Sequence, residues 1–379
     1  MQRPLAEPIP LSSDGSDFPA ALRAEALGLL DLPDGPRLVA ELLVRAAADE
    51  PLPTLAEAAI ALRGAAPMDR AVWAVTDQLV YSQVPNWHWA MLRDRARATA
   101  YRTAIEASVR SGMLVLEIGA GTGVLAMMAA QAGADHVFTV EANPLLAKIA
   151  RQCIARNGLS DRISVLAMHS TEVVVGRDLP SRADLLVHEI LSSAVLGEGL
   201  APTLDHAQAE LLVPDAPLLP EFIGIEAALS QDVTAGDEAW WQVDEFDLSP
   251  LSLLDAAAHG VPGKAPRQRL SAPVGVAEID LRAGDLMQPR RFAGPVEASR
   301  SGTVAGVEQW MKVCFPGGVV LNSDDCLSHW GTCYHPFGAQ REIAIGEKVD
   351  IEVALDSRTV SIGLNRETCS APTGWIMGL

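Results

Sequence analysis

The chain has 379 residues, and its 29 Lys and Arg against 48 Asp and Glu give a formal net charge of −19 at pH 7. Hydrophobic residues make up 49% of it, which excludes a disordered chain. So large a negative charge argues against a nucleic-acid partner, because proteins that bind nucleic acid present basic faces. It suits a small cationic substrate or a basic protein segment, although it serves solubility equally well.

The cysteines and the apolar segments restrict compartment and partners. The five cysteines include no CxxC pair, which predicts a reducing, cytoplasmic environment and no metal site. The first 15 residues are polar and broken by prolines, so we expect no signal peptide. No window of ~18 uncharged apolar residues is found, so we expect no membrane partner.

In chain order, residues 1–85 read as a helical N-terminal module of short helices separated by prolines. From residue 86 to 204, strands and helices alternate, which predicts a parallel sheet covered by helices, an α/β fold. This part opens with one long predicted helix over 88–109. Its predicted strands are 114–118, 136–142, 162–169 and 183–190.

Residues 205–379 change pattern, because polar and apolar residues alternate in segments bounded by Gly, Pro and Asp. This alternation predicts an antiparallel sheet or barrel. Residues 236–268 interrupt the pattern with aromatic residues and a predicted short helix. The predicted strands here are 221–229, 275–281, 349–355 and 358–364.

A glycine-rich turn follows the strand 114–118 and opens a helix. Its glycines let the backbone approach a ligand, and the helix start offers free N–H groups. Glu141 ends the next strand, where a carboxylate can bind both hydroxyls of a ribose. The pattern E-x-G-x-G-x-G favours a methyltransferase over a dinucleotide enzyme, which would need a small residue at Val124; a purely structural turn is the third alternative. The motif residues are Glu117, Gly119, Gly121 and Gly123.

Two glutamates, Glu189 and Glu198, lie nine residues apart at the carboxyl end of the strand 183–190. Ligands of open α/β sheets bind at this edge. A pair of carboxylates matches a guanidinium, which is planar and rich in donors, and could aim one of its nitrogens at an electrophile. The alternative is that Glu198 is an ordinary solvated loop residue.

Taken in order, these motifs resemble the protein arginine methyltransferase family. The likeness extends over residues 86–379 and includes EIGAGTG at 117–123, VE at 140–141 and HEILSSAVLGEG at 188–199. The Ser328-His329-Trp330 segment is similar to the family's Thr-His-Trp loop, and WWQVDEFDLSP at 240–250 is similar to its dimerisation arm. The segment His169-Ser-Thr-Glu-Val resembles the monomethylating subgroup.

The resemblance implies a Rossmann-like methyltransferase domain at 86–204, a β-barrel substrate domain at 205–379 with an arm near 236–268, and a homodimer. It implies S-adenosyl-L-methionine as cofactor, with S-adenosyl-L-homocysteine as product. Glu189, Glu198 and His329 are the expected catalytic residues. The expected cofactor-binding residues are Met91 near the methyl group, Arg97 on the methionine carboxylate, the motif residues Glu117, Gly119, Gly121 and Gly123, Glu141 on the ribose, and Ser170, Thr171 or Glu172 on adenine.

Substrate binding is expected from the glutamate pair, from His329 and Trp330, and from Trp87 and Trp89, which replace the family's tyrosine-containing lid segment. Met91 and Trp330 could instead be ordinary core residues, and Arg97 an exposed helix charge. We expect an arginine N-methyltransferase and favour free L-arginine as substrate with a monomethyl product. The alternatives are arginine in proteins, a non-catalytic cofactor-binding scaffold, and a nicotinamide dehydrogenase.

Overall fold

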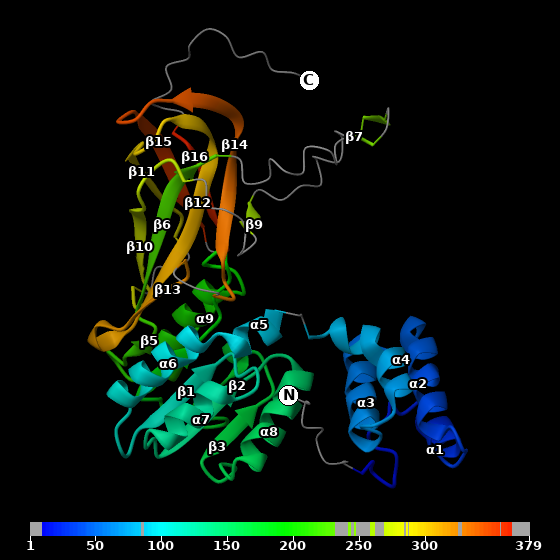
Figure 1. The fold of residues 1–379 in the computed structure, drawn as a ribbon. Helices are drawn as coiled ribbons and strands as arrows, with labels where there is room; N and C mark the ends of the chain where they lie inside the picture. The colour runs from blue at the N-terminus through cyan, green and yellow to red at the C-terminus, as the bar shows by residue number, and fades with distance from the viewer. Residues whose placement is uncertain are drawn as a thin grey trace.

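The computed structural model describes residues 10–84, 87–231, 242–243, 246–247, 258–261, 269–283, 286, 288–324, 328–356 and 358–365. Figure 1 shows three parts: a group of N-terminal helices, an α/β layer, and a β-rich part that stands on the α/β layer. This arrangement confirms the predicted fold class, a Rossmann-like α/β part followed by antiparallel strands and preceded by helices.

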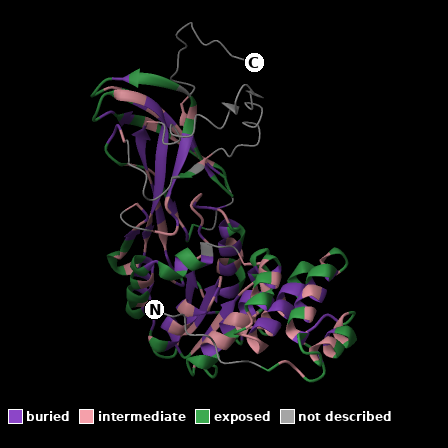
Figure 2. Cartoon of the chain, turned by 45° about the vertical axis from the view of Figure 1, so that its right-hand side comes forward, coloured by how far each residue is buried: buried purple, intermediate pink, exposed green. Residues whose placement is uncertain are grey.

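The N-terminal helices pack into a bundle with a core of its own. Leu55 and Leu62 are fully buried inside it, as Figure 2 shows for its inner faces. The buried Arg63 joins two of the helices, because its Nε donates to Thr76 Oγ1 over 2.7 Å and its Nη2 to Asp77 Oδ1 over 2.8 Å. The helices are α1 (Arg23–Leu30), α2 (Gly35–Arg45), α3 (Leu52–Ala65) and α4 (Arg70–Tyr81).

The predicted helix over 88–109 is two helices, α5 (Trp87–Arg93) and α6 (Arg95–Ser108). Asp94 separates them. Its backbone is extended, with φ −72° and ψ 95°, and its side chain accepts a hydrogen bond from the Arg97 N–H, 2.9 Å away. The break has a physical cause, since an aspartate that caps the start of a helix cannot itself be helical.

The α/β layer is built on a parallel sheet with strand order β3-β2-β1-β4-β5. β2 and β3 lie on one side of β1, and β4 and β5 lie on the other. The strand order therefore reverses between β1 and β4, so a crevice opens at the carboxyl ends of these two strands. The strands are β1 (Leu114–Ile118), β2 (His136–Val140), β3 (Ile163–Leu166), β4 (Leu185–His188) and β5 (Leu218–Leu219). The layer also contains α7 (Val124–Gln131), α8 (Pro144–Arg156) and α9 (Leu200–His206).

The β-rich part contains two antiparallel sheets that contact each other through β10 and β11 and through β14 and β16. The larger sheet comprises β6 (Phe222–Ser230), β9 (His259–Val261), β10 (Val274–Asp280), β12 (Gly302–Cys314), β13 (Val320–Asn322) and β14 (Thr332–Ile343). The smaller comprises β11 (Arg290–Glu297), β15 (Lys348–Leu355) and β16 (Val360–Leu364).

The arm predicted at 236–268 lies largely outside the described residues, and so does the short helix predicted within it. Within the arm, β7 (Gln242–Val243) pairs antiparallel with β8 (Phe246–Asp247). None of the helices in the described part of the chain combines the length and the apolar character needed to cross a membrane.

Candidate active site

The glycine-rich turn after β1 adopts the conformation that its glycines allow. Gly119, Gly121 and Gly123 all have positive φ, at 88°, 53° and 80°. A Cβ on Gly119 would lie 3.0 Å from Ile190 Cγ2, and one on Gly121 would lie 4.0 Å from the Met91 methyl carbon. Larger side chains would therefore fill the space above the turn, which a ligand needs.

Glu141 follows β2 and faces this turn. Its Oε2 accepts a hydrogen bond from Gly121 N and its Oε1 from Asn143 N, each over 2.8 Å. Burial raises the pKa of the Glu141 carboxyl, while these two N–H groups act in the opposite direction. The carboxyl is thus fixed at the strand end, in the place expected of a ribose acceptor.

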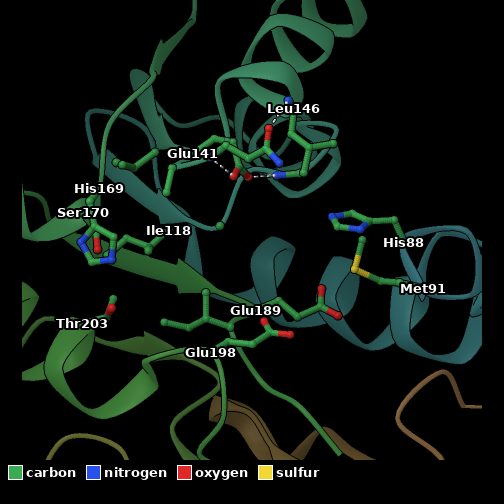
Figure 3. A pocket seen from close by; sticks show the side chains of 16 residues that line it. His88, Met91, Ile118, Glu141, Leu146, His169, Ser170, Glu189, Glu198 and Thr203 are labelled. Carbon is green, nitrogen blue, oxygen red and sulfur yellow. Dashed lines mark hydrogen bonds between the residues drawn. The ribbon is translucent and has the colours of Figure 1, made fainter. Parts of the chain in front are cut away.

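A cavity of about 260 Å³ lies at the carboxyl edge of the sheet. Figure 3 shows Glu141 on one side of it, Glu189 and Glu198 on the opposite side, and His88 and Met91 at one end. The residues that line it are His88, Met91, Ile118, Gly119, Gly121, Val140, Glu141, Ala142, Asn143, Leu146, His169, Ser170, Glu189, Ile190, Glu198 and Thr203.

Of the residues expected on adenine, the cavity includes Ser170, which starts the short 3₁₀ turn η2 (Ser170–Glu172). Thr171 and Glu172 are exposed and do not line it. His169, the residue before the turn, lines it instead. Its ring Nδ1 lies 2.8 Å from Thr171 Oγ1, which orients the imidazole.

The two glutamates of the loop after β4 both reach the cavity. Glu189 is held by Arg97: the guanidinium Nε donates to Glu189 Oε1 over 2.6 Å, and Nη2 forms an ion pair with Oε2. Glu198 has a left-handed backbone with φ 60°, unusual for a residue that is not glycine. Burial, and then the charge of Glu141, raises the pKa of the Glu198 carboxyl.

His329, from the β-rich part, lies beside Glu189. Its Nε2 lies 3.5 Å from Glu189 Oε1, and its Nδ1 lies 3.3 Å from Asp94 Oδ2. The His329 backbone N–H also donates to Asp94 Oδ2, over 3.2 Å. Burial acts to raise the pKa of Asp94, but the hydrogen bonds from His329 and Arg97 prevail and lower it. The imidazole thus bridges two carboxylates that come from the α/β layer.

Trp330 fixes this contact between the two parts. Its indole Nε1 donates to the Leu191 carbonyl over 2.8 Å, and its own carbonyl accepts from Ser193 Oγ. The side chain is buried, with 4% exposed, and it does not line the cavity. Trp330 therefore joins the β-rich part to the loop that carries the two glutamates.

The remaining predicted residues differ in placement. Met91 lines the cavity, whereas Trp89 is 49% exposed and lies outside the lining, and the side chain of Trp87 lies outside the described residues. His88, the residue before Trp89, lines the cavity. Glu117 does not line the cavity; it is 1% exposed and accepts a hydrogen bond from Thr139 Oγ1.

Sequence reasoning missed Asp94, Asn143, His88 and His169. The signal for Asp94 was its position three residues before Arg97, typical of a helix N-cap. Asn143 caps α8 in the same way, because its Oδ1 accepts from Leu145 N and Leu146 N. Among the described residues, no group of three His, Cys, Asp or Glu is placed to hold a metal ion.

Comparison with known proteins supplies the family. The family model for ribosomal protein L11 methyltransferase (PrmA) matches residues 102–245. Over 293 residues the chain is 34% identical to an arginine N(omega)-methyltransferase of Streptomyces achromogenes subsp. streptozoticus, covering 76% of this chain and 81% of that protein. The chain belongs to the protein arginine methyltransferase family. It is also 32% identical, over 273 residues, to protein arginine N-methyltransferase 7 of Drosophila erecta, covering 65% of this chain and 38% of that protein.

Solved structures of this family share the fold. The Trypanosoma brucei PRMT1 enzyme–prozyme complex with AdoHcy matches with a TM-score of 0.64 at 22% identity, covering 73% of this chain and 91% of that one. Arabidopsis thaliana protein arginine methyltransferase 10 matches with a TM-score of 0.58 at 18% identity, covering 72% and 96%. The protein is an S-adenosylmethionine-dependent arginine N-methyltransferase.

Proposed function

We propose that this methyltransferase acts on free L-arginine and transfers one methyl group to a terminal guanidino nitrogen, giving monomethylarginine. The observation that carries the arginine chemistry is the placement of Glu189 and Glu198 in one cavity with the glycine turn and Glu141. The Streptomyces relative, matched over 81% of its length, is named for arginine, whereas the Drosophila relative is named for protein arginine.

The residues present fit the cofactor. The glycine turn leaves room above it, and Glu141 is fixed at the end of β2 by two N–H groups. Gly119, Gly121 and Glu141 would hold its amino-acid and ribose parts, and Ser170 its adenine. When bound, S-adenosylmethionine supplies an electrophilic methyl group on sulfur.

The chain's own residues would bind and orient the guanidinium. A carboxylate has about four acceptor positions; on Glu189 Arg97 occupies two and His329 lies beside Oε1, which leaves room for a substrate N–H group on Oε2. Glu198 supplies a second carboxylate that is not neutralised by Arg97. The two together can hold different N–H groups of one guanidinium and leave a terminal nitrogen facing the methyl donor.

The methylated guanidinium must afterwards lose a proton. Glu189 would accept that proton; His329 Nε2 lies 3.5 Å from Glu189 Oε1, with Asp94 on the other side of the ring. This series can move the proton from the carboxylate to the imidazole without a strong base in the cavity. Asp94 would stabilise the imidazolium that results.

One assay tests substrate class and product together. Labelled cofactor is offered with free L-arginine and, in parallel, with an Arg-Gly-rich peptide, and the products are weighed by mass spectrometry. We expect label in free arginine with a single added methyl group. Label in the peptide alone would transfer the proposal to protein arginine, and a cofactor bound but never consumed would indicate a scaffold.

Two variants tie the result to the site. Glu189→Gln should lose at least about 100-fold in turnover while cofactor binding persists, because one carboxylate of the clamp loses its charge. Glu141→Ala should instead weaken cofactor binding by about 10- to 100-fold by calorimetry, with Glu106→Ala, an exposed carboxylate on α6, as the control. Full activity of Glu189→Gln would refute the clamp.

We also propose a homodimer formed through the arm at 236–268, on the resemblance of residues 240–250. Light scattering at micromolar concentration should give twice the 40.2 kDa chain mass. A monomeric mass would contradict the dimer without affecting the site.

A further inference from the structure

A polar cluster lies in the β-rich part, at the base of the segment that carries His329. Arg269 is at its centre. Its Nη1 donates to Asp324 Oδ2 over 2.7 Å and its Nη2 to Asp324 Oδ1 over 2.6 Å, so that the two groups meet fork to fork. Its Nε donates to Glu308 Oε2 over 2.8 Å, and Glu308 is fully buried.

The guanidinium of Arg269 is also contacted on its face, in addition to the hydrogen bonds at its edges. Its Cζ lies 4.1 Å from the centroid of the Trp310 ring, a stacking distance. Ser230 Oγ donates to the second oxygen of Glu308 over 2.9 Å. Arg269 therefore occupies one orientation, which is set by Asp324, Glu308 and an aromatic face.

The segment that carries His329 runs from Asp324 to Thr332. We call its two ends, at Ser323–Asp324 and at Gly331–Thr332, its stems, and Asp324 is linked to the second stem. Its Oδ1 accepts from Thr332 Oγ1 over 3.3 Å. The preceding residue, Ser323, donates from Oγ to the Gly331 carbonyl, also over 3.3 Å. The two stems are thus linked to each other at and beside Asp324, which Arg269 holds, and Ser328, His329 and Trp330 lie between Asp324 and Thr332 in the chain.

Between its two stems, this segment reaches the active site. His329 contacts Asp94 and Glu189 there, and Trp330 donates to the Leu191 carbonyl. The contacts of His329 are 3.3–3.5 Å long, so a small displacement of the stems would separate the imidazole from both carboxylates.

We propose that Arg269 is a positioning residue: by fixing Asp324 it sets the stems of the segment and holds His329 against Glu189 and Asp94. Lysine could not replace it, because an ammonium group is a point charge without the fork that meets Asp324 and Glu308 at once. The kinetic test of this proposal rests on the proposed function, because it measures methyl transfer. The hydrogen-exchange test does not.

The kinetic test is a double-mutant cycle between Arg269→Lys and His329→Gln. At saturating cofactor we expect Arg269→Lys to lower kcat/KM for the arginine substrate by about 10- to 100-fold, the scale of a displacement of about 1 Å. Cofactor affinity by calorimetry should change less than about twofold, because the cluster does not touch the cavity. In the His329→Gln background the same change should cost less than about twofold, because its effect passes through His329.

Arg282→Lys is the matched control. Arg282 lies in the same part of the chain, with its Cζ 4.6 Å from the Phe222 ring centroid, and it pairs with Asp280 and Glu221 at the surface. It should leave kcat/KM unchanged. Effects of Arg269→Lys that multiply with those of His329→Gln would indicate a general structural role and overturn the proposal.

A second readout does not depend on turnover. Amide hydrogen exchange of residues 328–332 should accelerate about tenfold or more in Arg269→Lys and not in Arg282→Lys, because the His329 N–H bond to Asp94 loosens. Unchanged exchange would overturn the proposal even if no arginine substrate is turned over. If Arg269→Lys does not fold, Thr332→Val, which removes the hydroxyl that donates to Asp324, should lower kcat/KM about threefold; no effect of Thr332→Val would likewise count against the proposal.

Discussion

Arg97 donates a hydrogen bond from Nε to Glu189 Oε1 over 2.6 Å, and its Nη2 pairs with the other oxygen of the same carboxylate. The expected partner of the cofactor's methionine carboxylate is thus in contact with one of the two carboxylates expected to bind the substrate. If Arg97 also binds the cofactor as expected, this buried cation would join the cofactor site to the substrate site, and a change at Arg97 would affect both.

Arg97→Lys should therefore impair both half-sites. Loss of the fork leaves Glu189 without its bidentate partner, so we expect kcat to fall about 100-fold and cofactor affinity about 10-fold. Single-turnover kinetics and calorimetry measure the two separately. Arg102→Lys, an exposed residue on the same helix, is the control and should change neither. An effect on cofactor affinity alone would mean that the contact with Glu189 is incidental.

The acid limb of the pH profile should belong in part to Glu198. The clamp needs this carboxyl ionised, and burial together with the charge of Glu141 raises its pKa. Activity is therefore present above that pKa and is lost as the pH falls through it, at a higher pH than for an ordinary glutamate. We expect Glu198→Gln to lower kcat/KM about 100-fold and to flatten this limb in a profile measured at saturating cofactor. A limb unchanged in Glu198→Gln would assign it to another group.

The N-terminal bundle should support cofactor binding through one hydrogen bond. Asn143 Nδ2 donates to the Gln83 carbonyl over 2.7 Å, and Asn143 lines the cavity beside Glu141. Asn143→Asp keeps the oxygen that caps α8 but removes this donor. Amide exchange over residues 70–84 should accelerate about tenfold and the cofactor Kd should rise about threefold. Asn157→Asp, at the exposed other end of α8, should do neither.

Glu117 should make folding stability fall as the pH rises. Burial raises its pKa from 4.5 to about 8, so between these values the folded chain binds a proton that the unfolded chain releases. The free energy of unfolding therefore decreases across that window, by on the order of 1–3 kcal/mol for this group. Glu117→Gln, which does not titrate, should reduce the decrease in denaturant unfolding measured at pH 5 and pH 8. Glu106→Gln, on an exposed face, should leave it intact.

Much of the α/β layer could be predicted because its signals are local. The apolar run 114–118 is β1 as predicted, and the glycine turn that follows has the positive φ values its residues allow. The strands predicted at 136–142 and 183–190 end earlier, at Val140 and His188. Glu141 and Glu189 leave the ladder there and turn to the cavity, and a strand pattern does not show where pairing stops.

What sequence could not show depends on contacts between distant segments. Asp94 breaks a helix that periodicity would continue, and its second partner, His329, is 235 residues away. The strand β12 was missed because it lies between β6 and β14 with eight successive residues buried, so it lacks alternation. The exposed Trp89 and the inward His88 also differ from the prediction, since the side of α5 that faces the cavity is set by packing.

Because Glu198 has a left-handed backbone, the residue that best stabilises this loop differs from the residue that we expect methyl transfer to require. Glycine would adopt φ 60° without strain, whereas a side chain there costs roughly 1 kcal/mol. A library of variants at this position selected for abundance in cells should therefore enrich glycine and asparagine. The same library selected for methyl transfer should retain glutamate. The residue preferred at position 198 would then differ between the two selections.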